Sequence, residues 1–542
     1  MRIGIGQINP TVGDIHGNTQ MILHYIEQAR TAGCELLAFP ELAIPGYSPL
    51  DLLWQPDFIP ACDAAVDVVR EASAGIGILL GSVTAEPSRG PANRDNLSSV
   101  SDGAGTALYD CAYLIDNRSI LARVDKMHLP AYDVDSERRY YTAGAGAEVH
   151  QFHDMAIGIN ICEDIWIDDG PTDVQASLGA EWIINLSASP FYCGKPEIRR
   201  QLVARRATEN DVPVLYVNLV GGQDGIIFDG GSFAVAADGR VVFRAPAFAD
   251  GLYVFDTADG VMDETRSDDD LTQARRAIVL GIRDYVRKNG FSSVVIALSG
   301  GIDSALVAAL AVDALGADAV TTVYMPSIHS SFESGEDARA CAAALGVEHL
   351  EISIDTIYAA LQASMPAPPS GIVDENLQPR VRGTLLMALA NQRNALALCP
   401  ANKSEVSVGY NTLYGDTVGA LAPIVDLYKE DVTAMTALYG DRIPPRILTK
   451  QPSAELRPNQ TDQDDLPAYD VLDPIVREAV ENHRTVEQIV AMGYDQAIVR
   501  NVLERIRRSE YKRAQLPPGI KVTPKAFGIG RRMPITNRFR PE

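Results

Sequence analysis

The first half of the chain alternates short apolar runs with segments of helical periodicity. Runs of strand length recur in the order RIGIGQI, ELLAFPEL, IGILLGSV, AIGINICEDIW, EWIINLSAS and VPVLYVNLV. Apolar residues spaced three and four apart predict helices near residues 18–32, 172–178 and 199–210. Strand pairs around GSFAVAADGRVVF complete the pattern. Strands and helices in this order predict an α/β sandwich with its helices outside.

The second half has an order typical of a parallel sheet. A helix-period segment at 272–288 stops at Asn289-Gly290, a pair that suits a helix C-terminus. The residues that follow predict strand 292–298, helix 304–315, strand 319–325, helix 334–345 and strand 349–354. This βαβαβ order implies right-handed crossovers and a ligand crevice at the carboxyl ends of the strands. We therefore expect a doubly wound, Rossmann-like sheet.

The two patterns meet at the stretch VFDTADGVMDETRSDDDL, which is acidic, poor in apolar residues and without periodicity. We predict a first domain at 1–256, a linker at 257–271 and a second domain at 272–542. No repeat is visible along the chain.

Charge narrows the kinds of partner. Among 542 residues, Lys and Arg number 47 and Asp and Glu 71, a formal net charge of −24. This balance argues against nucleic acid or an anionic membrane as the main partner. Anionic substrates would have to be held by local clusters of Lys, Arg and backbone N–H groups.

Cysteine usage and the chain start indicate a compartment. Seven cysteines without paired short spacings favour a reducing environment and no zinc site. The start MRIGIGQINP lacks the features of a signal peptide, and no apolar run approaches the roughly 20 residues that span a bilayer. We expect a soluble, cytoplasmic protein.

A glycine loop in the second half indicates phosphate chemistry. The stretch VVIALSGGIDSALVAAL, residues 294–310, passes from strand to helix through Gly300 and Gly301. These glycines let the backbone approach an anion, and the helix N-terminus attracts one. The lysine of a P-loop is missing. Asp303 would repel phosphate unless a divalent cation lay between them, so the loop predicts phosphate with Mg²⁺. The alternative is a tight turn with Asp303 as a first-turn helix carboxylate.

The letters SGGIDS resemble the pyrophosphate-loop signature S-G-G-x-D-S of ATP-splitting ligases. The longer stretch NLQPRVRGTLLMALANQRNALALCPANKSEVSVGYNTLYGD resembles the NAD synthetase pattern N-x-Q-x-R-x-R followed by N-K-S-E-x-x-x-G-Y-x-T-x-Y-G-D. PIVDLYKEDV, KQPSAELRPNQTDQDDLPAYDVLD and KAFGIGRRMPITNRFRP are also similar to that family. The resemblance spans nearly the whole second half.

The resemblance implies roles for individual residues. ATP would contact Ser299, Gly300, Gly301, Asp303, Ser304, Pro400 and Lys403. Mg²⁺ would bind Asp303 and Glu405. The dinucleotide substrate would contact Asn376, Arg380, Tyr410, Asp416 and Lys525. Spacing alone leaves the roles of Asn376 and Arg380 interchangeable.

The sequence departs from the family pattern at one point, and part of the motif also has a simpler structural interpretation. Pro400 and Ala401 stand where the family has a hydroxyl residue and a glycine, so a hydroxyl contact to ATP would be absent or supplied elsewhere. Asn402 and Glu405 also fit a helix N-cap and its capping-box partner. That interpretation leaves the glycines, tyrosines and arginines of the motif unexplained.

Three residues of the first half fall at or after strand ends. Cys162 ends the run NIC, Glu41 lies in FPEL and Lys126 in RVDKMHLP. A cysteine is more often a small buried hydrophobe. Together the three resemble the Glu-Lys-Cys triad of the nitrilase superfamily, whose fold is an α-β-β-α sandwich.

By this resemblance Glu41 takes the thiol proton and Cys162 attacks an amide carbon. Lys126 would lower the thiol pKa and stabilise the oxyanion. Glu137 matches a second family carboxylate that orients the site. The substrate would contact Tyr47, Tyr132, Ser187, Ser189 and Lys195.

Both halves together resemble the glutamine-dependent NAD synthetases. The resemblance implies that glutamine forms a Cys thioester and releases ammonia, which an internal route protects. The carboxylate of deamido-NAD would attack ATP, releasing pyrophosphate with Mg²⁺ as cofactor. Ammonia would then displace AMP to give NAD, the last step of NAD biosynthesis. We also expect a homo-oligomer.

Alternatives remain open at this point. A GMP-forming amidotransferase shares the glycine loop but lacks the NKSE block. An amidase regulated by a nucleotide would not release pyrophosphate, and a non-catalytic assembly module would not need Cys162 reactive. The tail from Lys521 to Arg540 carries six Lys or Arg. It is either a nucleic-acid arm or, as we favour, a segment packed near the anionic substrate, for instance across a subunit interface.

Overall fold

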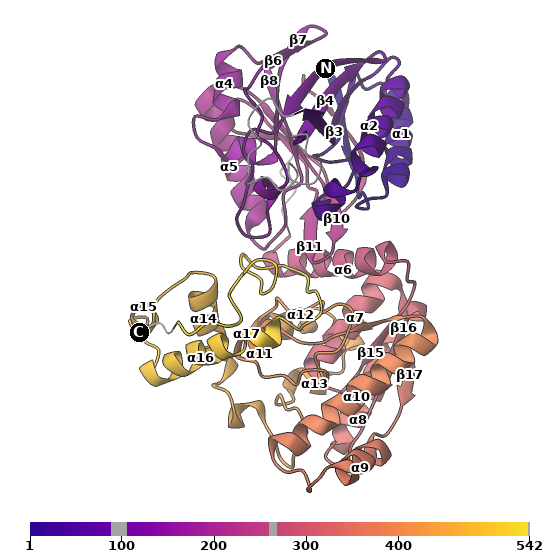
Figure 1. The fold of residues 1–542 in the computed structure, drawn as a ribbon, viewed down its shortest axis with the longest axis vertical. Helices are drawn as coiled ribbons and strands as arrows, with labels where there is room; N and C mark the ends of the chain where they lie inside the picture. The colour runs from indigo at the N-terminus through magenta and orange to yellow at the C-terminus, as the bar shows by residue number, and fades with distance from the viewer. Residues whose placement is uncertain (88–105, 259–267, 540–542) are drawn as a thin grey trace. The chain divides into compact units, whose positions relative to one another are not determined.

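The computed structural model describes residues 1–87, 106–258 and 268–539. The chain divides into two compact units, Met1–Gln223 with Ile227–Ser267 and Asp224–Ile226 with Asp268–Glu542. Most of the predicted linker and the last residue of the basic tail, Arg540, lie outside the described residues. Figure 1 labels the elements of both units.

The first unit contains two six-stranded sheets. One has the order β14-β1-β2-β3-β4-β5, and the other β13-β12-β9-β8-β7-β6. The first sheet consists of β1 (Arg2–Gln7), β2 (Leu36–Ala38), β3 (Gly77–Pro87), β4 (Thr106–Asp116), β5 (Ser119–Asp125) and β14 (Gly251–Asp256). The second consists of β6 (Val149–Phe152), β7 (Met155–Ile161), β8 (Trp182–Ser187), β9 (Val214–Asn218), β12 (Phe233–Val235) and β13 (Val241–Arg244). Strands β10 (Val220–Gln223) and β11 (Ile226–Asp229) form a separate pair.

The two sheets pack face to face through one apolar core. Ile3 and Leu114 of the first sheet share a buried cluster with Ile159 and Leu215 of the second. Helices α4 (Pro171–Ser177) and α5 (Lys195–Asn210) lie against the second sheet, where Val203 packs with Ile183 and Tyr216. Helices α1 (Ile15–Thr31) and α2 (Phe58–Ala72) lie beside the first sheet (Figure 1). The predicted α-β-β-α sandwich is confirmed.

The second unit is built on a parallel sheet of order β17-β16-β15-β18. Its strands are β15 (Val294–Ala297), β16 (Val320–Tyr324), β17 (Glu348–Glu351) and β18 (Leu396–Leu398). Helix α10 (Ile372–Arg393) packs on the sheet through a cluster that joins Val381 and Leu386 to Val295 and Val323. The predicted doubly wound, parallel sheet is confirmed.

Helices surround this sheet and extend beyond it. They are α6 (Asp270–Lys288), α7 (Ile302–Leu315), α8 (Phe332–Leu345), α9 (Asp355–Ser364), α11 (Lys403–Val408), α12 (Lys429–Ala437), α13 (Pro445–Thr449), α14 (Tyr469–Val480), α15 (Val486–Val490), α16 (Gln496–Arg508) and α17 (Glu510–Arg513). Helices α14, α15 and α16 share a separate apolar cluster. Among the described residues, no helix is both long and apolar enough to cross a membrane.

Candidate active sites

The triad residues of the first unit come together at the ends of three strands. Glu41 follows β2, Lys126 follows β5, and Cys162 follows β7. The Lys126 ammonium lies 2.6 Å from Glu41 Oε1, and both side chains are fully buried. Cys162 begins a short 3₁₀ helix (η3, Cys162–Trp166) with φ +46°, a left-handed conformation that is uncommon for cysteine. Such strain is typical of residues held for function.

Several influences act on the Cys162 thiol in opposite directions. Burial, followed by the charge of Glu41, raises the pKa of the Cys162 thiol well above its usual range, and Lys126 only partly opposes this. Lys126 lowers the thiol pKa, as predicted, but burial and Glu41 outweigh this effect in the resting site. Its ammonium is already shared between Glu41 and Glu137. The resting thiol keeps its proton, so the site needs a base to remove it.

Glu137 lies in the 3₁₀ helix η2 (Glu137–Arg139). One carboxylate oxygen accepts hydrogen bonds from Lys126 at 2.8 Å and from the Tyr47 hydroxyl at 2.9 Å. Burial raises the pKa of Glu137 to about 8, although Lys126 opposes it. Glu137 and Tyr47 thus lie with the triad, as the prediction requires.

Two predicted glutamine contacts lie near the thiol and present polar groups. Tyr132 is largely exposed, and its hydroxyl donates to Glu163 at 2.8 Å. The Lys195 ammonium lies 3.9 Å from the centre of the Trp166 ring. Burial lowers the pKa of Lys195 to about 8, while Cys162 acts in the opposite direction.

The two predicted serines lie deeper. The Ser187 hydroxyl donates to Asn185 Oδ1 at 2.6 Å, and the Ser189 hydroxyl accepts from Arg199 at 3.3 Å. Both serines are buried. These hydroxyls therefore serve internal partners in this structure.

The glycine loop connects β15 to α7 in the second unit. Gly300 has φ +79°, and a Cβ there would lie 2.3 Å from the Ser334 carbonyl oxygen. Only glycine fits this close approach. Ser304 Oγ donates to the Gly301 carbonyl at 3.0 Å and accepts from the Ser299 N–H at 3.2 Å, which closes the loop onto the helix start.

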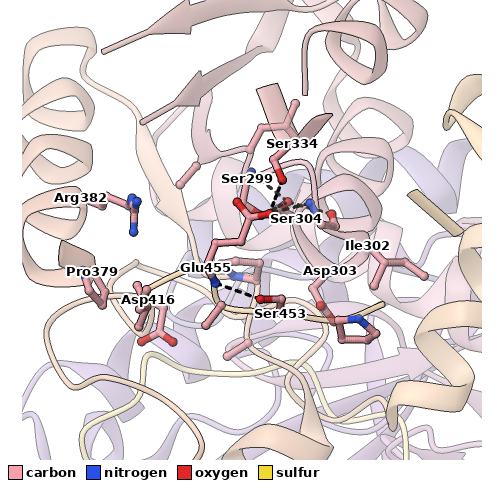
Figure 2. A pocket seen from close by; sticks show the side chains of 18 of the residues that line it. Ser299, Ile302, Asp303, Ser304, Ser334, Pro379, Arg382, Asp416, Ser453 and Glu455 are labelled. Atoms are coloured by element: carbon pink, nitrogen blue, oxygen red, sulfur yellow. Dashed lines mark hydrogen bonds between the residues drawn. The ribbon is translucent and has the colours of Figure 1, made fainter. Parts of the chain in front are cut away.

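A cavity of about 280 Å³ opens at this loop. Figure 2 shows its lining, with Ser299, Asp303 and Ser304 beside Glu455 and Ser453. Of the predicted ATP, metal and dinucleotide residues, the lining includes Ser299, Gly301, Asp303, Ser304, Pro400, Glu405, Tyr410 and Asp416. The loop and the NKSE segment therefore meet at one cavity.

Two carboxylates and a lysine form the charged centre of this cavity. Lys429 Nζ lies 2.6 Å from Asp303 Oδ2 and 3.3 Å from Glu405 Oε1. Asn402 donates to Asp303 Oδ1 at 2.8 Å. Burial raises the pKa of Glu405 to about 8, with Lys429 opposing and Asp303 adding to the rise.

Lys403 does not lie in the cavity lining, which corrects its predicted place at the phosphates. It is fully buried, and its ammonium lies 2.8 Å from Glu481 and 3.0 Å from Asp426. Helix α11 begins at Lys403 and turns this side chain into the interior. Lys429 occupies the position beside the carboxylates instead. Its signal was present in PIVDLYKEDV, but the motif alone did not single out its lysine.

Three predicted dinucleotide contacts also lie outside this lining. The Asn376 oxygen accepts from the Thr412 hydroxyl at 2.7 Å, and Arg380 is exposed. The Lys525 main-chain oxygen accepts from Lys403 at 2.9 Å. Gly300, of the predicted ATP set, shapes the loop without lining the cavity. The lining adds charged or polar residues to which the motifs gave no role, namely Arg382, Lys429, Lys450, Ser453, Glu455 and Asp462.

Arg382 differs from Arg380 by two helix positions and in its surroundings. Its Nε donates to the Met325 carbonyl at 2.8 Å, and Figure 2 shows its side chain at the cavity. Burial lowers the pKa of Arg382. Because its Nε contact orients the guanidinium, the remaining N–H groups are available to an anionic ligand.

Comparisons with known proteins agree with both sites. Residues 2–267 match the family model for carbon-nitrogen hydrolases, and residues 274–516 match that for NAD synthases. The glutamine-dependent NAD(+) synthetase of Synechocystis is 41% identical over 100% of this chain and 99% of its own length. That of Thermotoga maritima is 37% identical over 100% of this chain and 99% of its own.

Solved structures give the same result. The glutamine-dependent NAD(+) synthetase of Acinetobacter baumannii, solved with ADP, is 34% identical, has a TM-score of 0.77 and covers 99% of this chain and 98% of its own. The protein thus combines a carbon-nitrogen hydrolase domain with an NAD synthase domain. The chain belongs to the glutamine-dependent NAD(+) synthetase family.

Proposed function

We propose that this chain makes NAD from deamido-NAD, ATP and glutamine, and releases AMP, pyrophosphate and glutamate. The observation that carries the proposal is the presence in one chain of both reaction centres. Glu41, Lys126 and Cys162 lie together in the first unit, and a cavity in the second joins the glycine loop to Glu405 and Lys429. Full-length similarity to enzymes of this name supports the same conclusion.

In the first unit, the chemistry begins with the protonated thiol. Glu41 accepts the proton of Cys162, and the sulfur attacks the amide carbon of glutamine. The Lys126 ammonium stabilises the oxyanion, because a fixed buried charge needs little reorganisation. Glu41 returns the proton to the nitrogen as the intermediate collapses, so the C–N bond breaks, ammonia leaves and the thioester forms. Water then releases glutamate and restores the thiol.

In the second unit, the carboxylate of deamido-NAD attacks the α-phosphate of ATP. The loop N–H groups and the start of α7 face the departing pyrophosphate. Lys429 and Arg382 supply positive charge at the cavity. Ammonia from the first site then attacks the acyl carbon, and AMP leaves.

The residues of this cavity fit Mg²⁺. Asp303 and Glu405 supply carboxylate oxygens, the ligands that Mg²⁺ prefers. Burial, to which Asp303 adds, raises the pKa of Glu405 to about 8, so a cation between the two carboxyl groups would favour their ionised forms. When bound, Mg²⁺ would neutralise charge on the phosphates.

The test compares wild type with Cys162→Ala, each supplied with glutamine or with ammonium. The variant is expected to lose NAD formation from glutamine and to keep it from ammonium, because only the first site needs the thiol. Loss with both donors from a folded variant would contradict the assignment of separate half-reactions. Failure of wild type with either donor would overturn the proposed function.

Location and assembly stay predictions. The seven cysteines of the sequence, which have no paired short spacings, support a reducing cytoplasm. The exposed apolar residues Ile535 and Phe539, in the basic tail, support a homo-oligomer in which the tail meets a second copy. Sedimentation of the full chain, compared with a variant in which Ile535 and Phe539 are both replaced by alanine, tests the assembly.

A further inference from the structure

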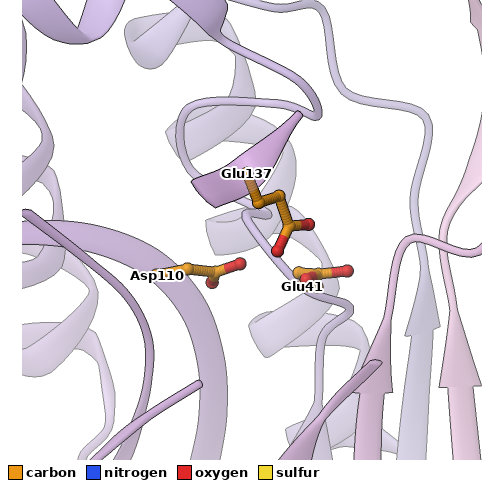
Figure 3. A group of neighbouring side chains, drawn as sticks. All are labelled: Glu41, Asp110 and Glu137. Carbon is orange, nitrogen blue, oxygen red and sulfur yellow. The ribbon is translucent and has the colours of Figure 1, made fainter. Parts of the chain in front are cut away.

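Asp110 lies within strand β4, buried beside the triad, and the mechanism gives it no role. Its side chain is 1% exposed. One carboxyl oxygen from each of Glu41, Asp110 and Glu137 lies within 4.8 Å of the other two. Figure 3 shows the three groups pointing toward a common point. Three buried acids so close together cannot all be ionised without compensation.

Among the described residues, one cation faces this cluster. Lys126 Nζ lies 2.6 Å from Glu41, 2.8 Å from Glu137 and 3.9 Å from Asp110. The ammonium therefore fills the place that a metal ion would take among these carboxyl groups. One positive charge facing three carboxyl groups leaves at least one of them to be stabilised by a proton.

Hydrogen-bond donors identify the group that holds the proton. Glu41 accepts from Lys126 at 2.6 Å and from the Ala188 N–H at 2.7 Å. Glu137 accepts from Lys126 at 2.8 Å and from Tyr47 at 2.9 Å. Within the described part of the chain, neither oxygen of Asp110 has a donor. A buried carboxylate without donors is the costliest of the three to ionise.

We propose that Asp110 is a protonated carboxylic acid in the resting enzyme and that its O–H donates to Glu41. The inference rests on the proposed function, in which Glu41 is the base. A donated hydrogen bond favours the ionised form of the acceptor, so Glu41 stays ready to take the thiol proton. Asp110 is thus a positioning residue that acts through Glu41 and does not touch glutamine.

Surrounding charges agree with this placement of the proton. Burial, followed by the charge of Glu41, raises the pKa of Asp110 well above its usual range, and Lys126 opposes this rise. For Glu137 the second influence is Lys126, which opposes the rise. The remaining titratable groups around Asp110 are Tyr141 and Cys111, whose pKa values burial raises well above the ordinary ones, so both stay neutral.

The experiment uses the full-length Asp110→Asn and Asp110→Leu variants. The asparagine amide can donate to Glu41 in place of the acid, whereas leucine has a similar size and no donor. Glutamine hydrolysis is measured against pH, circular dichroism and thermal unfolding report the fold, and infrared difference spectra between wild type and Asp110→Asn report protonated carboxyl groups.

We expect Asp110→Leu to lose about 10- to 100-fold in glutamine hydrolysis, the effect of one hydrogen bond to a charged group, with its acidic limb moved to higher pH. Asp110→Asn is expected to restore most of that loss. The wild-type spectrum is expected to contain a protonated-carboxyl C=O band that Asp110→Asn lacks.

Three results separate the possible errors. A folded Asp110→Asn variant that is as impaired as Asp110→Leu would show that Asp110 acts as a carboxylate. Absence of the infrared band would overturn the proposal even if the Leu variant fails to fold. A wild type that does not hydrolyse glutamine would instead refute the proposed function, while the band would still report the proton on Asp110.

Discussion

Lys429 and Lys403 of the second unit both pair with two carboxylates, but one lies at the cavity and the other in the interior. Lys429 lies at the cavity between Asp303 and Glu405, whose side chains are each 20% exposed. Lys403 is fully buried with Asp426 and Glu481. The first arrangement suits ligand binding, and the second suits stability.

These positions predict opposite results for matched substitutions. Lys429→Met is expected to lower NAD formation from glutamine and from ammonium by about 100-fold or more, because a charge aimed at the phosphates is lost. Lys403→Met is expected to cost about 3–5 kcal/mol of stability, because buried carboxylates lose their partner. Steady-state rates and thermal unfolding check both. A stable Lys403→Met that selectively loses ATP use would restore the role that the motif suggested.

Lys195 makes glutamine binding depend on pH. Its lowered pKa of about 8 means that it is charged below that pH and neutral above it. If its ammonium holds the glutamine carboxylate, KM for glutamine rises as pH passes 8, whereas Lys195→Arg stays charged and shows no such rise. KM measured from pH 7 to 9.5 in both proteins checks this. An equal rise in the arginine variant would exclude Lys195 as the cause.

At the scale of residues, the motifs predicted which side chains form the sites better than they predicted the electrostatic surroundings of those side chains. Glu41, Lys126 and Glu137 lie together as expected. The motif gave the direction in which Lys126 acts on the thiol pKa, but not the larger, opposite effect of burial. The proton on Asp110 was not predicted, because no local sequence pattern reveals that a buried carboxyl group lacks hydrogen-bond donors.

At the scale of elements, the predicted strands and helices lie within a few residues of their observed bounds, but helices α2, α9, α10 and α12 to α17 were not predicted. The predicted helix 304–315 begins two residues earlier, at Ile302, and the predicted strand 349–354 ends at Glu351. Strand β18 has only three residues, too few for a pattern. Helix α10 contains Pro379, which obscures helical propensity.

The glycine loop gives a prediction about backbone shape. Gly300→Ala adds a left-handed strain of about 1–2 kcal/mol and a clash with the Ser334 carbonyl. We expect it to abolish NAD formation from either donor and to spare glutamine hydrolysis. Gly290→Ala is the matched control, since Gly290 has the same φ of +79° with nothing near its Cβ position. Equal effects of the two would show that strain alone matters, and not the shape of the loop.

At the scale of the molecule, two kinds of chemistry occupy two separately folded units. The sequence indicated the change from a sandwich to a parallel sheet, because the first half contains strand pairs and the second half alternates strands and helices. The sequence could not supply the side-chain arrangement at each site, which depends on segments far apart in the chain. Asp303 and Lys429, for example, are separated by 126 positions and lie 2.6 Å apart.

The central claim is that nitrogen from glutamine becomes the amide of NAD in one enzyme. The most direct measurement supplies amide-¹⁵N glutamine, deamido-NAD, ATP and Mg²⁺, and follows NAD by mass spectrometry together with AMP and pyrophosphate. The account predicts labelled NAD in equal amount to AMP, and no NAD when Mg²⁺ is chelated although glutamate still forms. Glutamate and ammonia without NAD, with Mg²⁺ present, would contradict the account and leave an amidase.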